Sequence, residues 1–190
     1  MIPLRKLGLY GGSFDPIHIG HLILAREALE NLGLDRVVFI PAKISPHKLS
    51  HPPAPPELRC EMVAAAVAGE PGFGWSDCEI LREGPSFAVD TVREMRALHP
   101  GAEIFYMIGG DNLAALHTWN AIGALRGLVT FVVFPRGEGT ADHSFPVILR
   151  RVDISSTDIR NRIASGKSVR YLVPEAACTI LSQHRLYRND

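Results

Sequence analysis

The apolar residues of this chain gather in short runs, and longer segments with helical spacing lie between them. The clearest runs are Leu7–Tyr10, Val37–Ile40, Ile104–Ile108 and Leu128–Phe134, and a weaker one covers Val147–Val152. Apolar runs without polar alternation are typical of strands buried on both faces, as in a parallel sheet covered by helices. The pattern therefore predicts such strands at these five places.

Six segments between and after these runs are predicted helices. Gly33 and Gly166 follow two of them, where a glycine that ends a helix belongs. Because strands alternate with helices, the pattern predicts a doubly wound α/β sheet. The lack of a long linker or repeat indicates a single domain over residues 1–190. The predicted helices are roughly 20–32, 57–68, 86–98, 112–125, 156–165 and 174–184.

Two segments are predicted loops. The stretch HPPAPPE (51–57) contains four prolines, which lack an amide donor and fix φ, so we expect a surface loop that leads into the helix at Glu57. Arg136–Pro146 has two glycines and few apolar residues. It includes GEGTAD, in which Asp142 stands where the dinucleotide-binding fingerprint requires its last glycine. We therefore interpret this segment as a loop too.

Charge and cysteine content narrow the classes of function. Lys plus Arg and Asp plus Glu both number 20, so bulk electrostatics favour neither nucleic acid nor an anionic membrane as a partner. The three cysteines are scattered and form no CxxC pair, which argues against a disulfide framework or structural zinc. With no signal peptide and no apolar run near ~18 residues, the sequence predicts a cytoplasmic protein.

The first stretch with candidate chemistry is GGSFDPIHIGH (11–21), which follows the first predicted strand. Gly11 and Gly12 let a ligand approach the backbone, and the next helix start favours anions. His18 and His21 add donors for phosphate oxygens, and Gly20 between them leaves clearance for the ligand. The alternative is a tight turn with two ordinary histidines, but the combination favours a phosphate site.

A second candidate is ISSTDIRNRI (154–163). Ser155 and Asp158 have capping-box spacing, so a plain helix start is one interpretation. Arg160, however, places a cation in the first turn, where it opposes the helix dipole unless an anion is bound. Together with the serine hydroxyls and free amides, Arg160 indicates a second phosphate-binding element.

Three further features leave their interpretation open. Asp111 in GGDN (109–112) follows a strand, so it could meet a ribose hydroxyl or a metal-bound phosphate, or simply cap a helix. Trp119 is either a core residue or a platform for a base. In PAKISPHK (41–48), Lys43, His47 and Lys48 either face an anionic pocket or form a solvated basic loop.

The HIGH tetrapeptide also marks class I aminoacyl-tRNA synthetases, but this chain is too short for one and lacks their late lysine-rich signature. GGSFDPIHIGH combined with ISSTDIR resembles the related nucleotidyltransferases. Along nearly its whole length the chain resembles the bacterial nicotinate-nucleotide adenylyltransferases. The matching pieces are GGSFDPIHIGHL, PAKISPHK, SFAVDTV (86–92), GGDNLAALHTW (109–119), ISSTDIR and LVPEAACTILSQHRLY (172–187).

The resemblance implies a Rossmann-like fold whose C-terminal helical part, about 155–190, carries ISSTDIR. It implies transfer of AMP from ATP to nicotinate mononucleotide, with Mg²⁺, to give deamido-NAD and pyrophosphate in NAD biosynthesis. The implied partners are these two nucleotides, with no nucleic acid or membrane, and a homo-oligomer is compatible with the family.

The same resemblance implies a role for individual residues. The pyridine ring would lie in a pocket lined by Ser86, Ala88, Thr91 and Trp119. Relatives often carry Tyr-Thr where this chain has Phe87-Ala88, so recognition of the nicotinate carboxylate relies more on backbone amides here. The implied catalytic residues are His18, His21 and Arg160, and the implied ATP- and phosphate-binding residues are Gly11, Gly12, Ser13, Phe14, Gly20, Lys48, Gly109, Asp111, Ser156 and Thr157.

Three alternatives stay open at this point. A phosphopantetheine adenylyltransferase shares the superfamily motifs, although its relatives are shorter and carry threonine at the position of His18. An adenylyltransferase that prefers nicotinamide mononucleotide would differ only in its acceptor. A module that binds ATP without turnover could keep the glycine turn but has no need of both histidines and Arg160.

Overall fold

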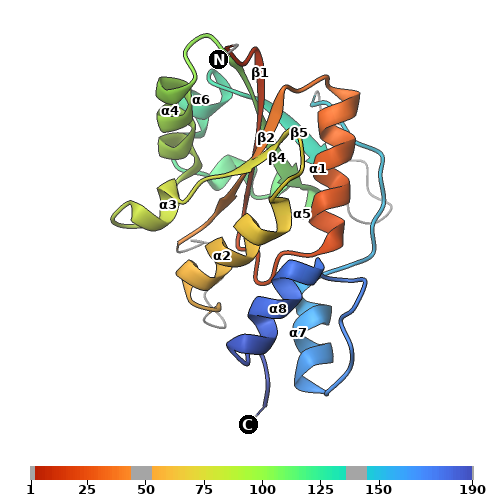
Figure 1. Cartoon of the computed structure of the whole chain (residues 1–190). Coiled ribbons are helices and arrows are strands. Elements are labelled where there is room, and N and C mark those ends of the chain that lie inside the picture. Colours follow the sequence, from red (N-terminus) through yellow and green to blue (C-terminus); the bar gives the residue numbers. More distant parts are fainter. Residues whose placement is uncertain (1–2, 44–52, 136–144, 190) are drawn as a thin grey trace.

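The computed structural model describes residues 3–43, 53–135 and 145–189. Its strands form one sheet with the order β3-β2-β1-β4-β5, and every neighbouring pair is parallel. The sheet is the central layer in Figure 1. The strands are β1 (Lys6–Gly12), β2 (Arg36–Pro41), β3 (Phe73–Trp75), β4 (Glu103–Gly109) and β5 (Thr130–Phe134).

Four of the five predicted strands are confirmed, and the reason is their burial on both faces. Leu7 and Leu9 of β1 pack into one core, and Tyr10 packs into the other. The expected strand Val147–Val152 is wrong, since only Val147 forms an isolated bridge, to Val133. Leu149, in the same stretch, is 81% exposed, so no second layer covers it.

The edge strand β3 was not predicted. It has only three residues, all at least partly exposed, and it pairs with β2 alone in the parallel sheet. Such a short edge strand carries no long apolar run to distinguish it from a loop. Its sequence, FGW, also has a glycine at its centre.

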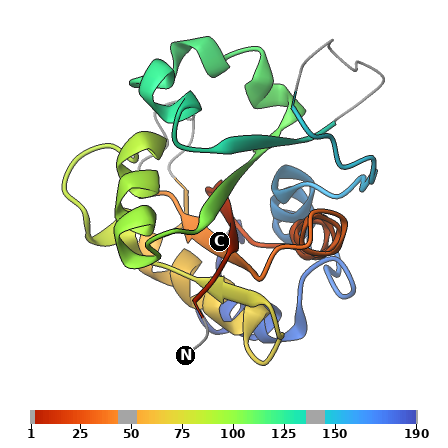
Figure 2. The same ribbon diagram turned by 90° about the horizontal axis from the view of Figure 1, so that it is seen from above.

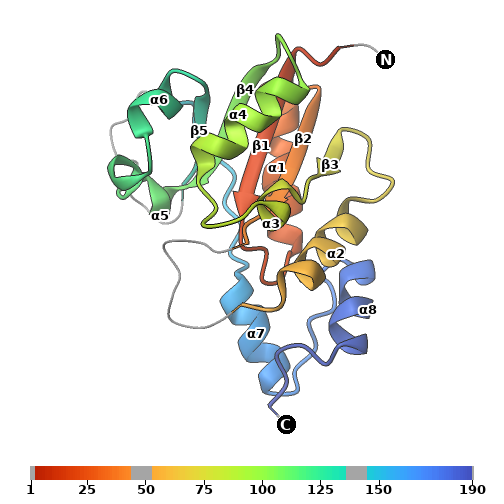
Figure 3. The same cartoon turned by 90° about the vertical axis from the view of Figure 1, so that its left-hand side faces the viewer.

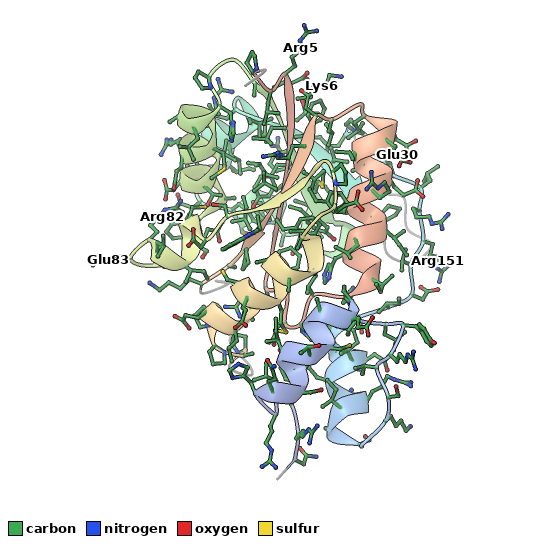
Figure 4. All side chains as sticks on the ribbon, viewed as in Figure 1. Arg5, Lys6, Glu30, Arg82, Glu83 and Arg151 are labelled. Carbon is green, nitrogen blue, oxygen red and sulfur yellow. The ribbon has the colours of Figure 1, made fainter. Side chains whose placement is uncertain are left out.

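Helices cover both faces of the sheet. One cluster of buried residues packs between the sheet and the helices on one face, which we call the first face. A separate cluster packs between the sheet and the helices on the opposite, second face. Figure 2, seen from above, shows α1 and α4 on opposite sides of the sheet, and Figure 4 shows side chains filling both layers. The first face carries α1 (Ile19–Asn31), α2 (Pro56–Val67), α7 (Ser156–Ala164) and α8 (Glu175–Gln183), and the second carries α3 (Cys78–Leu81), α4 (Ala88–Leu98), the 3-10 helix η1 (Leu116–Thr118) and α6 (Ile122–Arg126).

The predicted helix over 112–125 is wrong. The chain instead forms α5 (Gly110–Leu113), then η1, then α6. Trp119 takes an extended conformation at the end of η1, and Ala121 has a left-handed φ of 50°. An α-helix cannot continue through these two conformations.

The other helix limits lie within two residues of those predicted. Gly33 and Gly166 have φ of 60° and 69°, so both occupy the left-handed positions expected after a helix. Helix α2 begins at Pro56, one residue before the predicted start, because proline is tolerated at the first helical position. Of the two predicted loops, residues 51–52 and 136–144 lie outside the described part of the chain.

The sheet order places the chemistry-bearing loops at one edge. From β1 the chain moves to β2 and β3, then crosses to β4 on the other side of β1. Ligands of open α/β sheets bind beyond the carboxyl ends of the strands at such a switch point. Figure 3 shows α7 and α8 beyond this end of the sheet. None of the helices in the described residues is both long and apolar enough to cross a membrane.

Candidate active site

Two adjoining cavities lie at the carboxyl edge of the sheet. The larger, about 990 Å³, lies between the β1–α1 turn and the start of α7. The smaller, about 310 Å³, lies between the ends of β1 and β4 and the start of α4. Both touch the same stretch of floor, so two ligands bound in them would meet. The residues that line both cavities are Gly11, Gly12, Ser13, Ala42, Gly109 and Asn112.

The glycine pair at the end of β1 forms part of this shared floor. A Cβ at Gly11 would lie 2.8 Å from the Tyr106 hydroxyl, and one at Gly12 would lie 3.2 Å from the Phe14 ring. A side chain at Gly11 would therefore clash with Tyr106, and one at Gly12 would crowd the Phe14 ring. Phe14 itself turns the backbone through a φ of 46° and is buried. The two glycines thus place bare backbone on the wall of both cavities, and its contact with a ligand stays a prediction.

His18 and His21 stand side by side on the wall of the larger cavity. His18 is the buried N-cap of α1, and its backbone N–H donates to Nδ1 of His21 at 3.2 Å. Because Nδ1 accepts, the hydrogen of a neutral His21 ring must be on Nε2. His21 is therefore held in the form that can donate through Nε2.

Gly20, between the histidines, is in close contact with other parts of the protein. It lines the larger cavity, but a Cβ there would lie 3.0 Å from Nδ1 of His18 and 3.2 Å from Cγ1 of Val152. The space left by the missing side chain is thus taken by the His18 imidazole and Val152. These contacts are one reason for a glycine at this position, and clearance for the ligand stays a prediction.

The start of α7 is bound to the β1–α1 turn. Ser156 Oγ donates to the Pro16 carbonyl at 2.9 Å, and Arg160 Nη1 donates to the Asp15 carbonyl at 2.8 Å. Arg160 Nη2 donates to Thr157 Oγ1 at 3.1 Å. Ser156, Thr157 and Arg160 therefore line the same cavity as the histidines.

The capping interaction at this helix start is also present. Ser155 is the N-cap of α7, and its Oγ accepts the backbone N–H of Asp158 at 3.1 Å. The two interpretations of ISSTDIR are thus compatible, because the cap builds the helix end that faces the cavity. Because α7 begins at Ser156, Arg160 lies just past the first turn, whereas the sequence predicts it within that turn. Arg160 and the remaining first-turn amides offer donors to an anion, whose binding stays a prediction.

One charged residue of this cavity has a role that the sequence did not reveal. Arg59 of α2 is fully buried and donates to the carbonyls of Ser13 at 2.6 Å, Ala54 at 2.9 Å and Lys43 at 3.4 Å. Burial lowers the pKa of its guanidinium, and the Asp15 carboxylate opposes that shift. Arg59 therefore joins the β1–α1 turn to both ends of the loop before α2. In the sequence, the signal that could have indicated this role is a single cation within an otherwise apolar face of the helix.

The smaller cavity has an aromatic wall. Trp119 packs edge-on against Tyr106, with ring centroids 5.9 Å apart and planes at 83°. Within the described residues, the buried Trp119 Nε1 has no hydrogen-bond partner. Phe87 and Ala88 at the start of α4 complete the wall. Trp119 thus belongs to the core and to the cavity at once. Its core role is confirmed, and its role as a platform for a ring stays a prediction.

Thr91 lies behind this wall rather than on it. Its hydroxyl donates to Oε1 of Glu79 at 2.7 Å and accepts from Nη1 of Arg82 at 3.1 Å. Glu79, missed by the sequence analysis, is buried and does line the smaller cavity. Burial raises the pKa of Glu79, whereas hydrogen bonds from Thr91 and Ser86 lower it.

Ser86 connects this network to β2, because its Oγ accepts the Lys43 N–H at 3.0 Å. Lys43 Nζ in turn donates to the Arg82 carbonyl at 3.1 Å, beside α3, where Figure 4 labels Arg82. Lys43 also lines the larger cavity. The end of β2 is thereby fixed between the two cavities.

Other predicted residues are only partly described. Asp111 lies in α5, directly after β4, so its backbone is at the carboxyl edge. Lys48 and His47 lie outside the described residues. Among the described residues, no group of three or more His, Cys, Asp and Glu side chains could hold a metal ion.

The two cavities differ in chemistry. The larger has four cationic side chains, two histidines and one described carboxylate on its wall, which suits a polyanion such as a triphosphate. The smaller has tryptophan, tyrosine and phenylalanine side chains, which suit a flat ring. A ligand with a phosphate and a ring could therefore reach from one into the other.

Comparison with known proteins places this geometry in context. A cytidylyltransferase-like family model matches residues 9–162. A probable nicotinate-nucleotide adenylyltransferase of Thermus thermophilus is 46% identical, over 96% of this chain and 100% of the relative. One of Lactiplantibacillus plantarum is 41% identical, over 100% of this chain and 91% of the relative. The nicotinic acid mononucleotide adenylyltransferase of Plasmodium falciparum, solved with NaAD, is similar in fold, with a TM-score of 0.78, 19% identity and coverage of 96% and 97%.

Proposed function

This chain belongs to the cytidylyltransferase-like family and, within it, to the nicotinate-nucleotide adenylyltransferases, and we propose that AMP passes from ATP to nicotinate mononucleotide where its two cavities meet. The observation that carries the proposal is their shared glycine floor. A basic cavity suited to a triphosphate adjoins an aromatic cavity suited to a pyridine ring. The reaction gives nicotinate adenine dinucleotide and pyrophosphate, a step of NAD biosynthesis.

We assign the larger cavity to ATP. His18, His21 and Arg160 contact its phosphates, and Ser156 and Thr157 contribute the α7 helix start. The turn from Gly11 to Phe14, with Gly20 and Gly109, brings backbone close to the nucleotide. Asp111 is assigned to the ribose and Lys48 to the phosphates, in keeping with the family resemblance.

We assign the smaller cavity to nicotinate mononucleotide. The pyridine ring packs against Trp119, and its carboxylate meets Ser86, Ala88 and the free amides that begin α4. The Ser86 hydroxyl already accepts the Lys43 N–H, so its remaining capacity is limited. Thr91 acts from behind the wall, through Glu79.

The reaction needs no covalent nucleophile. An oxygen of the mononucleotide 5′-phosphate attacks the α-phosphorus of ATP in line, the bond to the bridging oxygen breaks, and pyrophosphate leaves with that electron pair. The enzyme contributes by holding two polyanions together and by donating hydrogen bonds to oxygens that gain charge. His21 Nε2–H is one such donor, already oriented by the His18 backbone.

We propose that Mg²⁺ arrives on the triphosphate as Mg·ATP. Magnesium commonly keeps several waters and binds through phosphates with one or two carboxylates. Asp15 is a described carboxylate on the wall of the larger cavity. It could bind the metal only if its hydrogen bond from Tyr187 loosened. The metal would reduce the repulsion between the two phosphate groups.

We further propose that residues 1–190 act as one domain in the cytoplasm, where ATP is available. The three cysteines are free, which suits a reducing compartment. The part from about 155 to 190, which carries ISSTDIR, belongs to the catalytic unit because Arg160 binds the β1–α1 turn.

The first test is pyrophosphate release from Mg·ATP with nicotinate mononucleotide, nicotinamide mononucleotide and phosphopantetheine offered separately. We expect the highest kcat/KM with nicotinate mononucleotide, by at least about tenfold or 1.4 kcal/mol. Equal rates with nicotinamide mononucleotide would contradict the assignment of the carboxylate pocket. If ATP bound but no acceptor led to the release of pyrophosphate, the protein would be an ATP-binding module and not an enzyme.

A further inference from the structure

We propose that Tyr187, beyond the last helix, is a positioning residue of the ATP site, which orients Arg160 through Asp15. This inference rests on the proposed function, since it takes the larger cavity to be the site of ATP. Tyr187 lines that cavity, and its ring packs against the core on the α1 face of the sheet. Its hydroxyl therefore reaches the site from the opposite end of the chain.

The first observation is that two donors share one oxygen of Asp15. The Tyr187 hydroxyl donates to Oδ1 at 2.6 Å, and the Ala54 backbone N–H donates to the same oxygen at 2.9 Å. Asp15 is 9% exposed, so these bonds are largely shielded from water. Hydrogen bonds to a charged acceptor are stronger than neutral ones. Together the two donors fix the orientation of the carboxylate.

The second observation is what the other oxygen faces. Asp15 Oδ2 lies 3.6 Å from Nη1 of Arg160, an ion pair without close contact. Nη1 instead donates to the Asp15 carbonyl, and Nη2 to Thr157. A guanidinium has five N–H donors, so Arg160 keeps donors for a phosphate.

These two observations give Tyr187 a function. The Asp15 carboxylate and the ATP phosphates compete for Arg160, because both are anions. With Oδ1 fixed by its two donors, Asp15 stays in the orientation that leaves Oδ2 at a distance from Arg160. Without the Tyr187 hydroxyl, the carboxylate could turn and form a closer ion pair. Arg160 would then be less available to ATP.

The backbone of Tyr187 indicates that its place is fixed by its surroundings. Its φ is 62°, a left-handed conformation that costs energy for a residue other than glycine. Burial, the hydrogen bond to Asp15 and the Asp15 charge all raise the pKa of the phenol. The hydroxyl thus stays protonated and remains a donor across the physiological pH range.

Tyr187→Phe is the direct test, because it removes the hydroxyl and keeps the packed ring. We expect KM for ATP to rise about tenfold and KM for nicotinate mononucleotide to stay within about twofold, while Tm falls somewhat because a shielded hydrogen bond is lost. A purely structural role would raise both KM values together. Either that result or an unchanged KM for ATP would overturn the inference.

Tyr171→Phe is the matched control. Tyr171 lies in the same C-terminal part and also has a left-handed φ, of 69°, but it is 79% exposed and does not line the larger cavity. We expect its KM for ATP to equal that of the wild type. An equal rise in both variants would assign the effect to the C-terminal segment in general, against the inference.

A double-mutant cycle with Asp15→Asn tests the route of the effect. If Tyr187 acts through the Asp15 carboxylate, Tyr187→Phe should change KM for ATP by less than about twofold when it is added to the Asp15→Asn variant. A full additional tenfold would exclude the route through Asp15. Binding of ATP alone, measured by calorimetry, separates this inference from the proposed function. Kd for ATP should rise in Tyr187→Phe even if the wild type transferred no AMP, and an unchanged Kd would overturn the inference alone.

Discussion

The imidazole rings of His18 and His21 stack, with centroids 3.6 Å apart and planes 23° from parallel. The backbone N–H of His18 holds Nδ1 of His21, so the protein itself orients the pair. Preorganised donors stabilise developing charge without reorganisation during the reaction. The stack is therefore the feature of the site from which the clearest loss of activity is expected.

Replacing His21 by alanine should lower kcat by about 10²–10³, the usual loss for one preorganised donor. The measurement is steady-state pyrophosphate release at saturating Mg·ATP and nicotinate mononucleotide. His184→Ala serves as the control, because His184 is exposed beyond α8 and should keep the wild-type kcat. A near-normal kcat in the His21→Ala enzyme would show that His21 has no role in the reaction.

Replacing Gly20 by alanine should reduce activity without weakening the fold. The new Cβ would lie 3.0 Å from Nδ1 of His18, so the buried imidazole must shift. Alanine also improves helix propensity by about 1 kcal/mol, which offsets some of the crowding. We expect kcat to fall about tenfold, since small misplacements of catalytic groups are costly, and the free energy of unfolding to change by less than about 1 kcal/mol.

Gly123→Ala is the matched control for this prediction. Gly123 lies in α6, and nothing approaches within 4 Å of a Cβ built there. We expect unchanged activity and a gain of about 1 kcal/mol in the free energy of unfolding. Equal kcat values for the two variants would show that Gly20 has no special relation to His18.

Replacing Glu79 by glutamine should change how stability depends on pH. Burial raises the pKa of Glu79 in the folded state above its unfolded value. Its contribution to stability is therefore fully present below the unfolded pKa of about 4.3 and is lost as pH rises through the folded pKa. Glutamine does not ionise, so the variant should gain stability relative to the wild type between acid and neutral pH.

Urea unfolding at several pH values measures this difference in the free energy of unfolding. Glu61→Gln is a suitable control, because Glu61 is exposed on α2. We expect its difference from the wild type to stay constant over the same pH range. If Glu79→Gln gave a constant difference as well, burial would not be controlling the ionisation of Glu79.

The cysteines of the folded protein should resist alkylation. Burial raises the pKa of Cys60 to about 11, and it also raises the pKa of Cys78 and Cys178. Because the thiolate is the reactive form, Cys60 should react about a hundredfold more slowly than an ordinary thiol at neutral pH. Iodoacetamide labelling with and without guanidinium measures the effect. Rapid labelling of Cys60 in the native protein would contradict this prediction.

The sequence predicts most of the sheet because burial on both faces leaves a local signature. Leu7 and Leu9 face one core while Tyr10 faces the other, so the whole run must be apolar. Where structure depends on non-local pairing, the signature is missing, as in the short edge strand β3. The break at Ala121 escapes prediction for a related reason, since alanine has no intrinsic preference for a left-handed φ.

The site is predictable to the extent that its residues are adjacent in sequence. The histidines and Arg160 each lie in a motif whose chemistry can be inferred from neighbouring residues, and both motifs line one cavity. Arg59 and Glu79 act through partners on other elements, at the carbonyl of Ser13 and the hydroxyl of Thr91. The apolar neighbours of Arg59 on α2 indicate its burial, but neighbouring residues do not indicate the partners of either side chain, which emerge only from the fold.

Arg160 and the Asp15 carbonyl that it contacts are 145 positions apart, and Ser156 and the Pro16 carbonyl are 140 apart. A ribosome therefore completes the glycine turn and both histidines long before it adds the arginine that faces them. Contacts between distant parts of a chain form late in folding because their loops are costly to close. A growing chain thus carries half of a nucleotide site for most of its synthesis. Because a ligand that binds only the folded state stabilises it, ATP would stabilise the fold fully only after Arg160 has been added.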